Sequence, residues 1–279
     1  MSAIALPLSF RRHTLPGFHL SLGFTLFYLA TLVLVPLLAL LIRPWSLGLD
    51  GFWAAMTAPR VLAALRLSFG TAMAACVIDS GFGLVIAWVL VRYRFAGKGL
   101  LDALIDLPFA LPTAVAGIAL STLYAPNGWI GGILMHYGIK VAYTPWGVLV
   151  AMTFIALPFT VRTIQPVLSE LGRESEEAAA TLGATRLQII GRVALPMLLP
   201  AILTGAALAF ARAVGEYGSI IFLAGNLPGI SEIAPLLIVI KLEQYDYAGA
   251  AGIGVVMLAA SFIMLLALNA LQSWAAKRR

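Results

Sequence analysis

Long apolar stretches, separated by short polar segments, set the pattern of this chain. A membrane core of about 30 Å is crossed by about 20 residues of α-helix, and each stretch is long enough for one crossing. The residue-by-residue alternation of a membrane β-strand is absent. We therefore predict an all-α integral membrane protein with six transmembrane helices, at residues 18–42, 65–91, 101–124, 145–165, 195–224 and 248–273.

Prolines interrupt the third and fourth predicted spans. Pro108 and Pro112 lie in LPFALPTAVAGIALSTLY, and Pro158 lies in the fourth span. A proline removes a backbone donor and clashes with the preceding turn, so we expect a kink or a short break. Pro108, Pro112 and Thr113 are therefore candidates for a pore-lining kink, with simple bending as the alternative. Segments 46–60, 125–132 (APNGWIGG) and 225–247 are interpreted as loops, the first partly amphipathic.

Composition supports this interpretation. The chain is 61% hydrophobic and 11% charged, whereas soluble domains carry about 25% charged residues. Two arginines, Arg11 and Arg12, precede a first span that is too long for the apolar core of a cleaved signal peptide, so we expect a retained signal-anchor. The single cysteine, Cys76, rules out an internal disulfide, and the scattered His13, His19 and His136 show no metal-ligand spacing.

The cations predict the orientation. A cytoplasmic N-terminus places twelve on the cytoplasmic side and five on the other, which favours N-in, C-in topology and accounts for the net charge of +6 without a nucleic-acid partner. The twelve are Arg11, Arg12, Arg92, Arg94, Lys98, Arg162, Arg173, Arg186, Arg192, Lys277, Arg278 and Arg279, and the five are Arg43, Arg60, Arg66, Lys140 and Lys241.

A charged segment between the fourth and fifth spans, EEAAATLGATRLQIIGRVALP (176–196), departs from the apolar pattern. Ser175 is a candidate N-cap for a short helix whose first turn carries Glu176 and Glu177, where carboxylates complement the helix dipole. Gly183 is suited to end that helix in a left-handed conformation. A second helix is expected over 185–193, after which Leu195 and Pro196 turn the chain into the fifth span.

The spacing of this segment resembles the EAA loop of ABC importer permeases. Glu-Ala-Ala at 177–179 is followed after three residues by Gly183, and nine further residues lead to Val193. Leu195-Pro196 completes the pattern. In that family isoleucine is commoner than valine at the position of Val193. The resemblance implies a cytoplasmic coupling helix that docks on an ATP-hydrolysing subunit; a solvated amphipathic loop is the alternative. The implied ATPase-coupling residues are Glu176, Glu177, Ala178, Ala179, Gly183, Leu195 and Pro196.

The resemblance extends along nearly the whole chain. RYRFAGKGLLDALIDLPFALPTAVAGIAL, VRTIQPVLSELG and ARAVGEYGSIIFLAGN look like the sulfate/thiosulfate permease subunits known as CysT or CysU. The last two are also similar to molybdate permeases, whereas IKVAYTPWGV points toward the sulfate branch. This resemblance implies a type I ABC importer permease fold, a CysW-like second permease in a heterodimer, two CysA-like ATPase subunits and a periplasmic binding protein for sulfate or thiosulfate.

The same resemblance implies a permease subunit that is no enzyme and needs no cofactor, with ATP bound by the partner ATPases. No GxxxxGK[ST] phosphate loop occurs in the sequence. We expect a multi-pass protein of the bacterial inner membrane, in contact with the lipid bilayer. Its predicted parts are an N-terminal segment with the first span and a periplasmic loop (1–62), a permease core (63–274) containing the coupling loop (170–196), and a basic tail (275–279).

Polar residues inside the predicted spans are the remaining site candidates. Asp79 would be costly in lipid, so we expect it to face the bundle interior as a gate or as an interhelical hydrogen-bonding partner. Arg212 and Glu216 are four residues apart and able to pair, either on an oxyanion path or as a structural ion pair. Gly215 and Gly218 allow close backbone approach there, as at a dimer interface.

The EAA-type loop and the resemblance along the chain predict import of sulfate or thiosulfate by alternating access, driven by a separate ATPase. Molybdate, tungstate or another oxyanion is an alternative substrate. An ion-coupled secondary transporter or a channel is the alternative from a different class, and the EAA-type loop argues against it.

Overall fold

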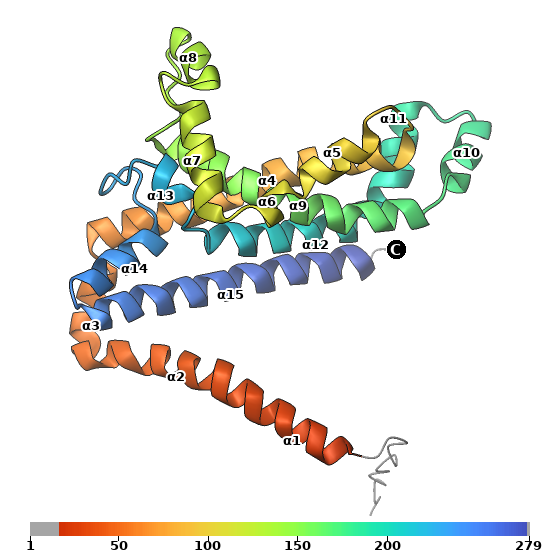
Figure 1. Ribbon diagram of the computed structural model, residues 1–279. Coiled ribbons are helices and arrows are strands. Elements are labelled where there is room, and N and C mark those ends of the chain that lie inside the picture. Colours follow the sequence, from red (N-terminus) through yellow and green to blue (C-terminus); the bar gives the residue numbers. More distant parts are fainter. Residues whose placement is uncertain (1–16, 278–279) are drawn as a thin grey trace, which may run out of the picture.

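The structure, a computed structural model, describes residues 17–277, and every regular element within them is helical. The N-terminal half contains α1 (Phe18–Leu29), the π-helix η1 (Ala30–Leu34), α2 (Val35–Ile42), the 3₁₀-helix η2 (Arg43–Leu47), α3 (Gly48–Met56), α4 (Pro59–Arg92), α5 (Lys98–Ile105), α6 (Leu107–Ala110), α7 (Thr113–Tyr124) and α8 (Trp129–His136). The C-terminal half contains α9 (Pro145–Glu170), α10 (Glu174–Thr181), α11 (Arg186–Ile189), the π-helix η3 (Ile190–Ala194), α12 (Leu195–Val214), α13 (Ile220–Leu223), α14 (Ala234–Glu243) and α15 (Tyr247–Lys277) (Figure 1). The expectations for Arg11, Arg12, His13, Arg278 and Arg279 lie outside the described residues.

Five helical segments among the described residues are long and apolar enough to cross a membrane: Leu20–Met56, Pro59–Arg92, Pro145–Glu170, Arg186–Val214 and Tyr247–Ser273. They correspond to the first, second, fourth, fifth and sixth predicted spans. The third predicted span is divided among α5, α6 and α7: Asp106 separates the first two, and extended backbone at Leu111 and Pro112 separates α6 from α7. The break that the prolines predicted is therefore confirmed, with α7 the short apolar helix that follows it.

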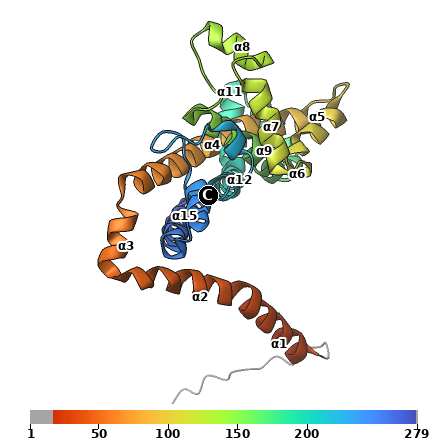
Figure 2. The ribbon, with the colours of Figure 1, turned by 60° about the vertical axis from the view of Figure 1, so that its left-hand side comes forward.

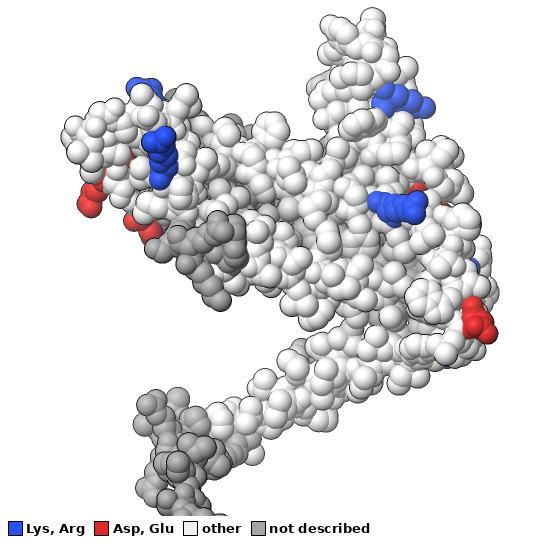
Figure 3. Space-filling model, turned by 180° about the vertical axis from the view of Figure 1, so that it is seen from behind, with Lys and Arg blue, Asp and Glu red and all other residues white. Residues whose placement is uncertain are grey.

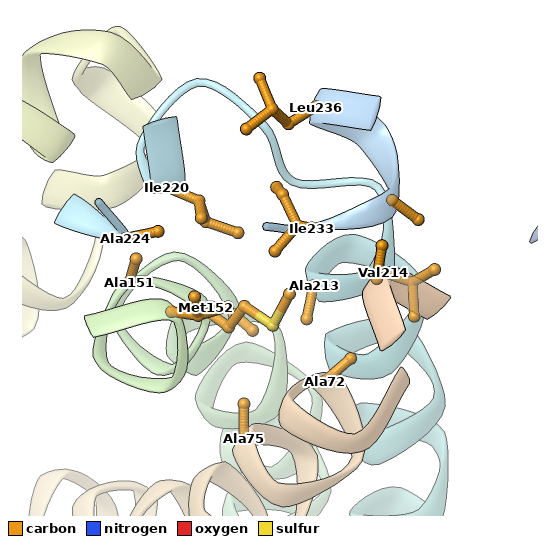
Figure 4. Close-up of a cluster of buried hydrophobic side chains, with 14 of the residues drawn as sticks. Ala72, Ala75, Ala151, Met152, Ala213, Val214, Ile220, Ala224, Ile233 and Leu236 are labelled. Atoms are coloured by element: carbon orange, nitrogen blue, oxygen red, sulfur yellow. The ribbon is translucent and has the colours of Figure 1, made fainter. Parts of the chain in front are cut away.

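The core lies where α4, α9 and α12 pack side by side, with α15 against α12 (Figure 1). Alanines fill much of the contact, and Ala72, Ala75, Ala151 and Ala213 are fully buried. Figure 4 shows these alanines around Met152, below Ile220 and Ile233 from the α13–α14 region. Small side chains let helix backbones approach closely, which is how packing stabilises helices in a bilayer that offers little hydrophobic driving force.

The first span stands apart from this core. Figures 1 and 2 show α1 and α2 extending away from the bundle, and α2 and η2 contact the bundle chiefly through α15. Its apolar side chains are exposed along the whole length, as for Leu20, Phe24 and Leu38. After η2, α3 returns the chain to the bundle and buries Met56 while leaving Trp53 exposed, as the partly amphipathic pattern predicted.

The predicted start of the fifth helix is confirmed, because α12 begins at Leu195 with Pro196 in its first turn, but the chain does not turn there. The chain runs helically from α11 through η3 into α12, and Leu195 N–H bonds to the Ile190 carbonyl in a π-type turn. A proline in a regular α-helix clashes with the carbonyl four residues earlier. The wider π turn accommodates Pro196 without a break, and η1 stands in the same relation to Pro36.

All three segments predicted as loops contain helical residues: α3 lies within 46–60, α8 begins within 125–132 and α14 lies within 225–247. Within 225–247, α14 has only ten residues, which is too short for a span. Because polar segments flank it, the apolar pattern did not predict a helix there. Within the glycine-rich segment, α8 begins at Trp129, and Gly131 lets its first turn pack on the backbone at the end of α7, because a Cβ there would lie 1.9 Å from the Ala125 carbonyl oxygen.

Charges gather at the ends of the molecule. Seen from behind, Lys, Arg, Asp and Glu lie at the end formed by α10 and α11 and at the opposite end, and the surface between them is uncharged (Figure 3). An uncharged belt between charged ends is the surface that a bilayer requires.

Candidate functional site

The charged segment forms a compact helix pair, α10 and α11, at one end of the bundle (Figure 1). Gly172 has a left-handed backbone (φ +60°) after α9, and α10 begins at Glu174 with Arg173 as its N-cap. The predicted cap, Ser175, is wrong: it lies inside the first turn, because the turn at Gly172 lets the helix start earlier. Three carboxylates, Glu174, Glu176 and Glu177, occupy the first turn, as the helix dipole favours.

Gly183 ends α10 in the left-handed conformation that the sequence predicted, with φ +86°. Its N–H bonds to the Ala180 carbonyl, and the Ala184 N–H bonds to the Ala179 carbonyl, so the last carbonyls of the helix are satisfied. Thr185 and Gln188 then form a capping box that starts α11. Local sequence therefore fixes both the end of one helix and the start of the next.

The outer surface of this pair combines charge with apolar side chains. Leu182 is 89% exposed and Leu187 is 83% exposed, on either side of Gly183. Glu177 and Ala178 are also exposed. Two leucines protruding from a charged loop have no partner surface among residues 17–277, which is typical of a protein-binding site.

The inner surface of the pair is tied to the end of α4. Arg92 Nη2 donates to Glu176 Oε1 at 2.6 Å and to the Gly172 carbonyl at 2.7 Å, and Nε donates to the same Oε1 at 3.1 Å. Arg173 Nη2 donates to the Arg92 carbonyl at 2.6 Å. A hollow of about 440 Å³ lies between these elements, lined by Trp88, Arg92, Tyr93, Arg173, Glu176, Glu177, Ala180, Arg186, Ile189 and Ile190.

A second ion cluster joins α5 to α9. Arg162 Nε and Nη2 donate to both oxygens of Asp106, at 2.8 and 2.6 Å, and Nη1 donates to Asp102 at 2.7 Å. The apolar pattern of the sequence did not predict this cluster. The spacing of Asp102 and Asp106, four residues apart in a supposed span, was the available signal.

The other candidate region is a second break, Gly215–Ser219, between α12 and α13. Arg212 and Glu216 pair as predicted, at 2.5 Å. Glu216 is almost fully buried, and its other oxygen accepts bonds from the Ser219 N–H and hydroxyl, each at 2.9 Å. Because α12 ends at Val214, the pair braces the broken segment rather than a helix face.

This break packs against the start of α7. A Cβ at Gly218 would lie 2.2 Å from Thr113 Oγ1, and one at Gly117 would lie 2.4 Å from the Ser219 carbonyl oxygen. The structure thus brings together Thr113, Glu216 and Gly218, with Pro112 at the N-cap of α7. Gly215 has no such close neighbour, and Pro108 lies apart, buried in α6, which packs on α9.

Asp79 lies away from both regions, in the crossing of α4, α9 and α12. It is fully buried, and neither carboxylate oxygen has a hydrogen-bond partner among the described residues. One turn further along α4, Gly83 packs on Thr160, which also contacts Gly205 of α12. The interior position that the sequence predicted is confirmed, and the hydrogen-bonding partner is not present in this conformation.

Residues 79–279 match the family described as the binding-protein-dependent transport system inner membrane component. The chain belongs to this family. It is therefore an inner-membrane permease with several spans, and families of this kind work with an ATPase and a substrate-binding protein. Sulfate transport system permease protein CysT of Salmonella typhimurium is 49% identical to the permease over 94% of this chain and 95% of the relative. The protein of the same name from Synechocystis is 51% identical over 90% and 87%.

Solved structures support the fold. A chain of a bacterial alginate ABC transporter, crystallised with an alginate-bound periplasmic protein, superposes with a TM-score of 0.75 over 90% of the permease and 92% of that chain. The two sequences are only 17% identical, so the likeness concerns the type I importer permease fold and not the substrate.

Proposed function

We propose that this permease is the sulfate- or thiosulfate-translocating subunit of an ATP-driven importer, moved by a separate ATPase through the α10–α11 loop. The observation that carries the coupling role is the outer surface of that loop, where Leu182 and Leu187 are among the most exposed apolar side chains of the described chain. The substrate rests on the sulfate transport relatives, which match about nine-tenths of the chain or more at 49–51% identity.

The proposed assembly has a CysW-like second permease, two CysA-like ATPases that bind ATP, and a periplasmic sulfate-binding protein. With the N-terminus and C-terminus in the cytoplasm, α10 and α11 face the ATPases. An exposed leucine pair costs free energy in water and gains it when a partner covers the pair. Glu177 adds a charge to this surface, and the small Ala178 beside it lets the helix fit into a groove on the ATPase.

The substrate path is proposed to pass the two opposed breaks, at Leu111–Pro112 and at Gly215–Ser219. Non-helical backbone at membrane depth persists where protein or a water-filled path satisfies its polar groups. Arg212 is about one-third exposed there, and Nη1 is its only nitrogen with a partner among the described residues. Alternating access then consists of movement of these segments when the ATPases close.

Co-purification of the ATPase tests the coupling role. Leu182→Asp places a carboxylate in the proposed contact, so the ATPase subunit should be lost while the permease remains inserted in the membrane. The matched control is Leu227→Asp, a leucine 49% exposed in the segment between α13 and α14 at the other end of the bundle, which should retain the ATPase. Retention in both variants, or uptake by the permease alone, would contradict the proposal.

A further inference from the structure

Two adjacent glutamates of α10 have different environments. Glu177 is exposed, and although it also lines the hollow beside α4, its carboxylate makes no hydrogen bond or ion pair within residues 17–277. The Glu176 side chain is 22% exposed and points to the end of α4, where the Arg92 side chain is only 10% exposed. Adjacent side chains on a helix point about 100° apart, so the contact that Glu176 makes with α4 leaves the Glu177 carboxylate available to another partner.

The environment of Arg92 makes this contact a firm one. Glu176 Oε1 accepts from two guanidinium nitrogens, at 2.6 and 3.1 Å, and the Gly172 carbonyl accepts from one of them at 2.7 Å. The Trp88 ring lies under the guanidinium carbon, with 5.7 Å between that carbon and the ring centroid. Charge-assisted bonds to a planar, stacked guanidinium hold geometry better than a lysine contact.

A reciprocal bond closes the connection. Arg173, the N-cap of α10, donates to the carbonyl of Arg92, which is the last residue of α4. Each element thus contributes one arginine to the other, and α10 is attached to α4 although 84 residues separate Arg92 from Glu176. By chain connection alone, α10 is joined only to α9 and to α11.

We propose that Glu176 and Arg92 are positioning residues that transmit displacement of α10 to α4, whereas Glu177 faces the ATPase. This inference rests on the proposed function and assigns Glu176 a task different from docking. The helix α4 packs on α9 and α12 along the alanine-filled core. Movement of α10 also reaches the core through the chain at α9 and through its contacts with α11 and η3, and the ion pair adds a direct path to α4, the third helix of the core.

The experiment uses the complete importer reconstituted in proteoliposomes, with Arg92→Glu, Glu176→Arg, and both changes together. Three quantities are measured: ATPase retention, ATP hydrolysis and sulfate taken up per ATP hydrolysed. Each single reversal should retain the ATPase and hydrolysis, and should lower uptake per ATP about tenfold, the loss expected for one charge-assisted contact. The double exchange should restore most of the sulfate uptake per ATP hydrolysed, because the pair is re-formed with its charges reversed.

Glu177→Arg is the matched control and should release the ATPase. Release of the ATPase by Glu176→Arg as well would overturn the proposal, since both glutamates would then be docking residues. Unchanged uptake per ATP in the single reversals, or no restoration by the exchange, would also overturn it. Where a reversal prevents insertion, Arg92→Lys and Glu176→Gln replace it. These variants should also lower sulfate uptake per ATP hydrolysed, by less than the reversals do. A wild-type permease that never binds an ATPase would instead reject the proposed function.

Discussion

At the scale of single residues, the buried carboxylates are held in contrasting ways. Glu232 is buried and receives two bonds from Arg60, at 2.7 and 2.8 Å. Glu216 is buried and shared between Arg212 and Ser219. Asp79 is equally buried and has no such bond within residues 17–277. An unpaired carboxylate in a membrane span costs about 2.5–3.5 kcal/mol, so Asp79 does not stabilise this conformation by an ion pair.

Replacing the Asp79 and Glu232 carboxyl groups with amides should change the stability of the permease in different ways. Asp79→Asn replaces a buried carboxyl group that has no partner within residues 17–277 with an amide of nearly the same size, so the unfolding midpoint in detergent should stay unchanged or rise. Glu232→Gln, the matched control, weakens a bidentate ion pair and should cost about 1–3 kcal/mol. Thermal unfolding of the purified permease measures both. A clear loss of stability in Asp79→Asn would show that the carboxylate has a partner after all.

Asp246 predicts a pH dependence outside the spans. Lys241 Nζ lies 2.9 Å from Oδ2, and the Gly249 N–H donates to Oδ1, and these contacts lower the pKa of Asp246. A lowered native pKa means that the stabilisation is present above the ordinary value of about 3.9 and is lost as pH falls through the native value. Asp246→Asn should therefore be less stable than wild type near neutral pH, by under about 1 kcal/mol because the pair is partly exposed. The same difference at acid pH would contradict this account.

At the scale of elements, the broken helices carry the candidate path. The prolines predicted the break before α7 because Pro112 cannot continue an α-helix. The end of α10 and the start of α11 were also predictable, because Gly183 and Thr185 each act within one turn. The start of α10 was misplaced, because Gly172 rather than Ser175 decides it, and α14 was missed because ten residues carry no spanning signal.

The contact between α7 and the second break should be intolerant of side chains. Gly117→Ala places a Cβ 2.4 Å from the Ser219 carbonyl, so backbone must move, and we expect a loss of about 1–3 kcal/mol in stability and of most uptake. Gly215→Ala is the control, because the nearest atom to its Cβ is 3.9 Å away. Equal behaviour of the two variants in uptake and thermal unfolding would disprove the close packing.

Gly183 should be sensitive for a different reason. No atom lies within 4 Å of a Cβ built there, but its φ of +86° disfavours any side chain by about 1–2 kcal/mol. Gly183→Asp should therefore distort the end of α10 and abolish ATP-driven uptake while the permease remains inserted. Membrane fractionation and uptake assays check this. Normal uptake by this variant would argue against coupling through α10.

At the scale of the whole molecule, both candidate regions depend on contacts between residues far apart in the sequence, which sequence patterns do not predict. The membrane class, the long helices and the coupling segment follow from local patterns. The Arg92–Glu176 pair joins residues 84 apart, and the Gly117–Ser219 approach joins residues on opposite sides of α9 in the chain. No periodicity or spacing rule brings such residues together. The two candidate regions are thus assembled by the packing of α4, α7, α9 and α12.

The most direct test of the account is uptake of labelled sulfate by cells that lack this permease and receive it back on a plasmid. Wild-type permease should restore ATP-dependent uptake, thiosulfate should compete, and molybdate in excess should compete weakly. Leu182→Asp should fail to restore uptake although the protein is inserted. Restoration by the Leu182→Asp variant, or uptake that persists without the ATPase, would contradict an importer driven through the α10–α11 loop.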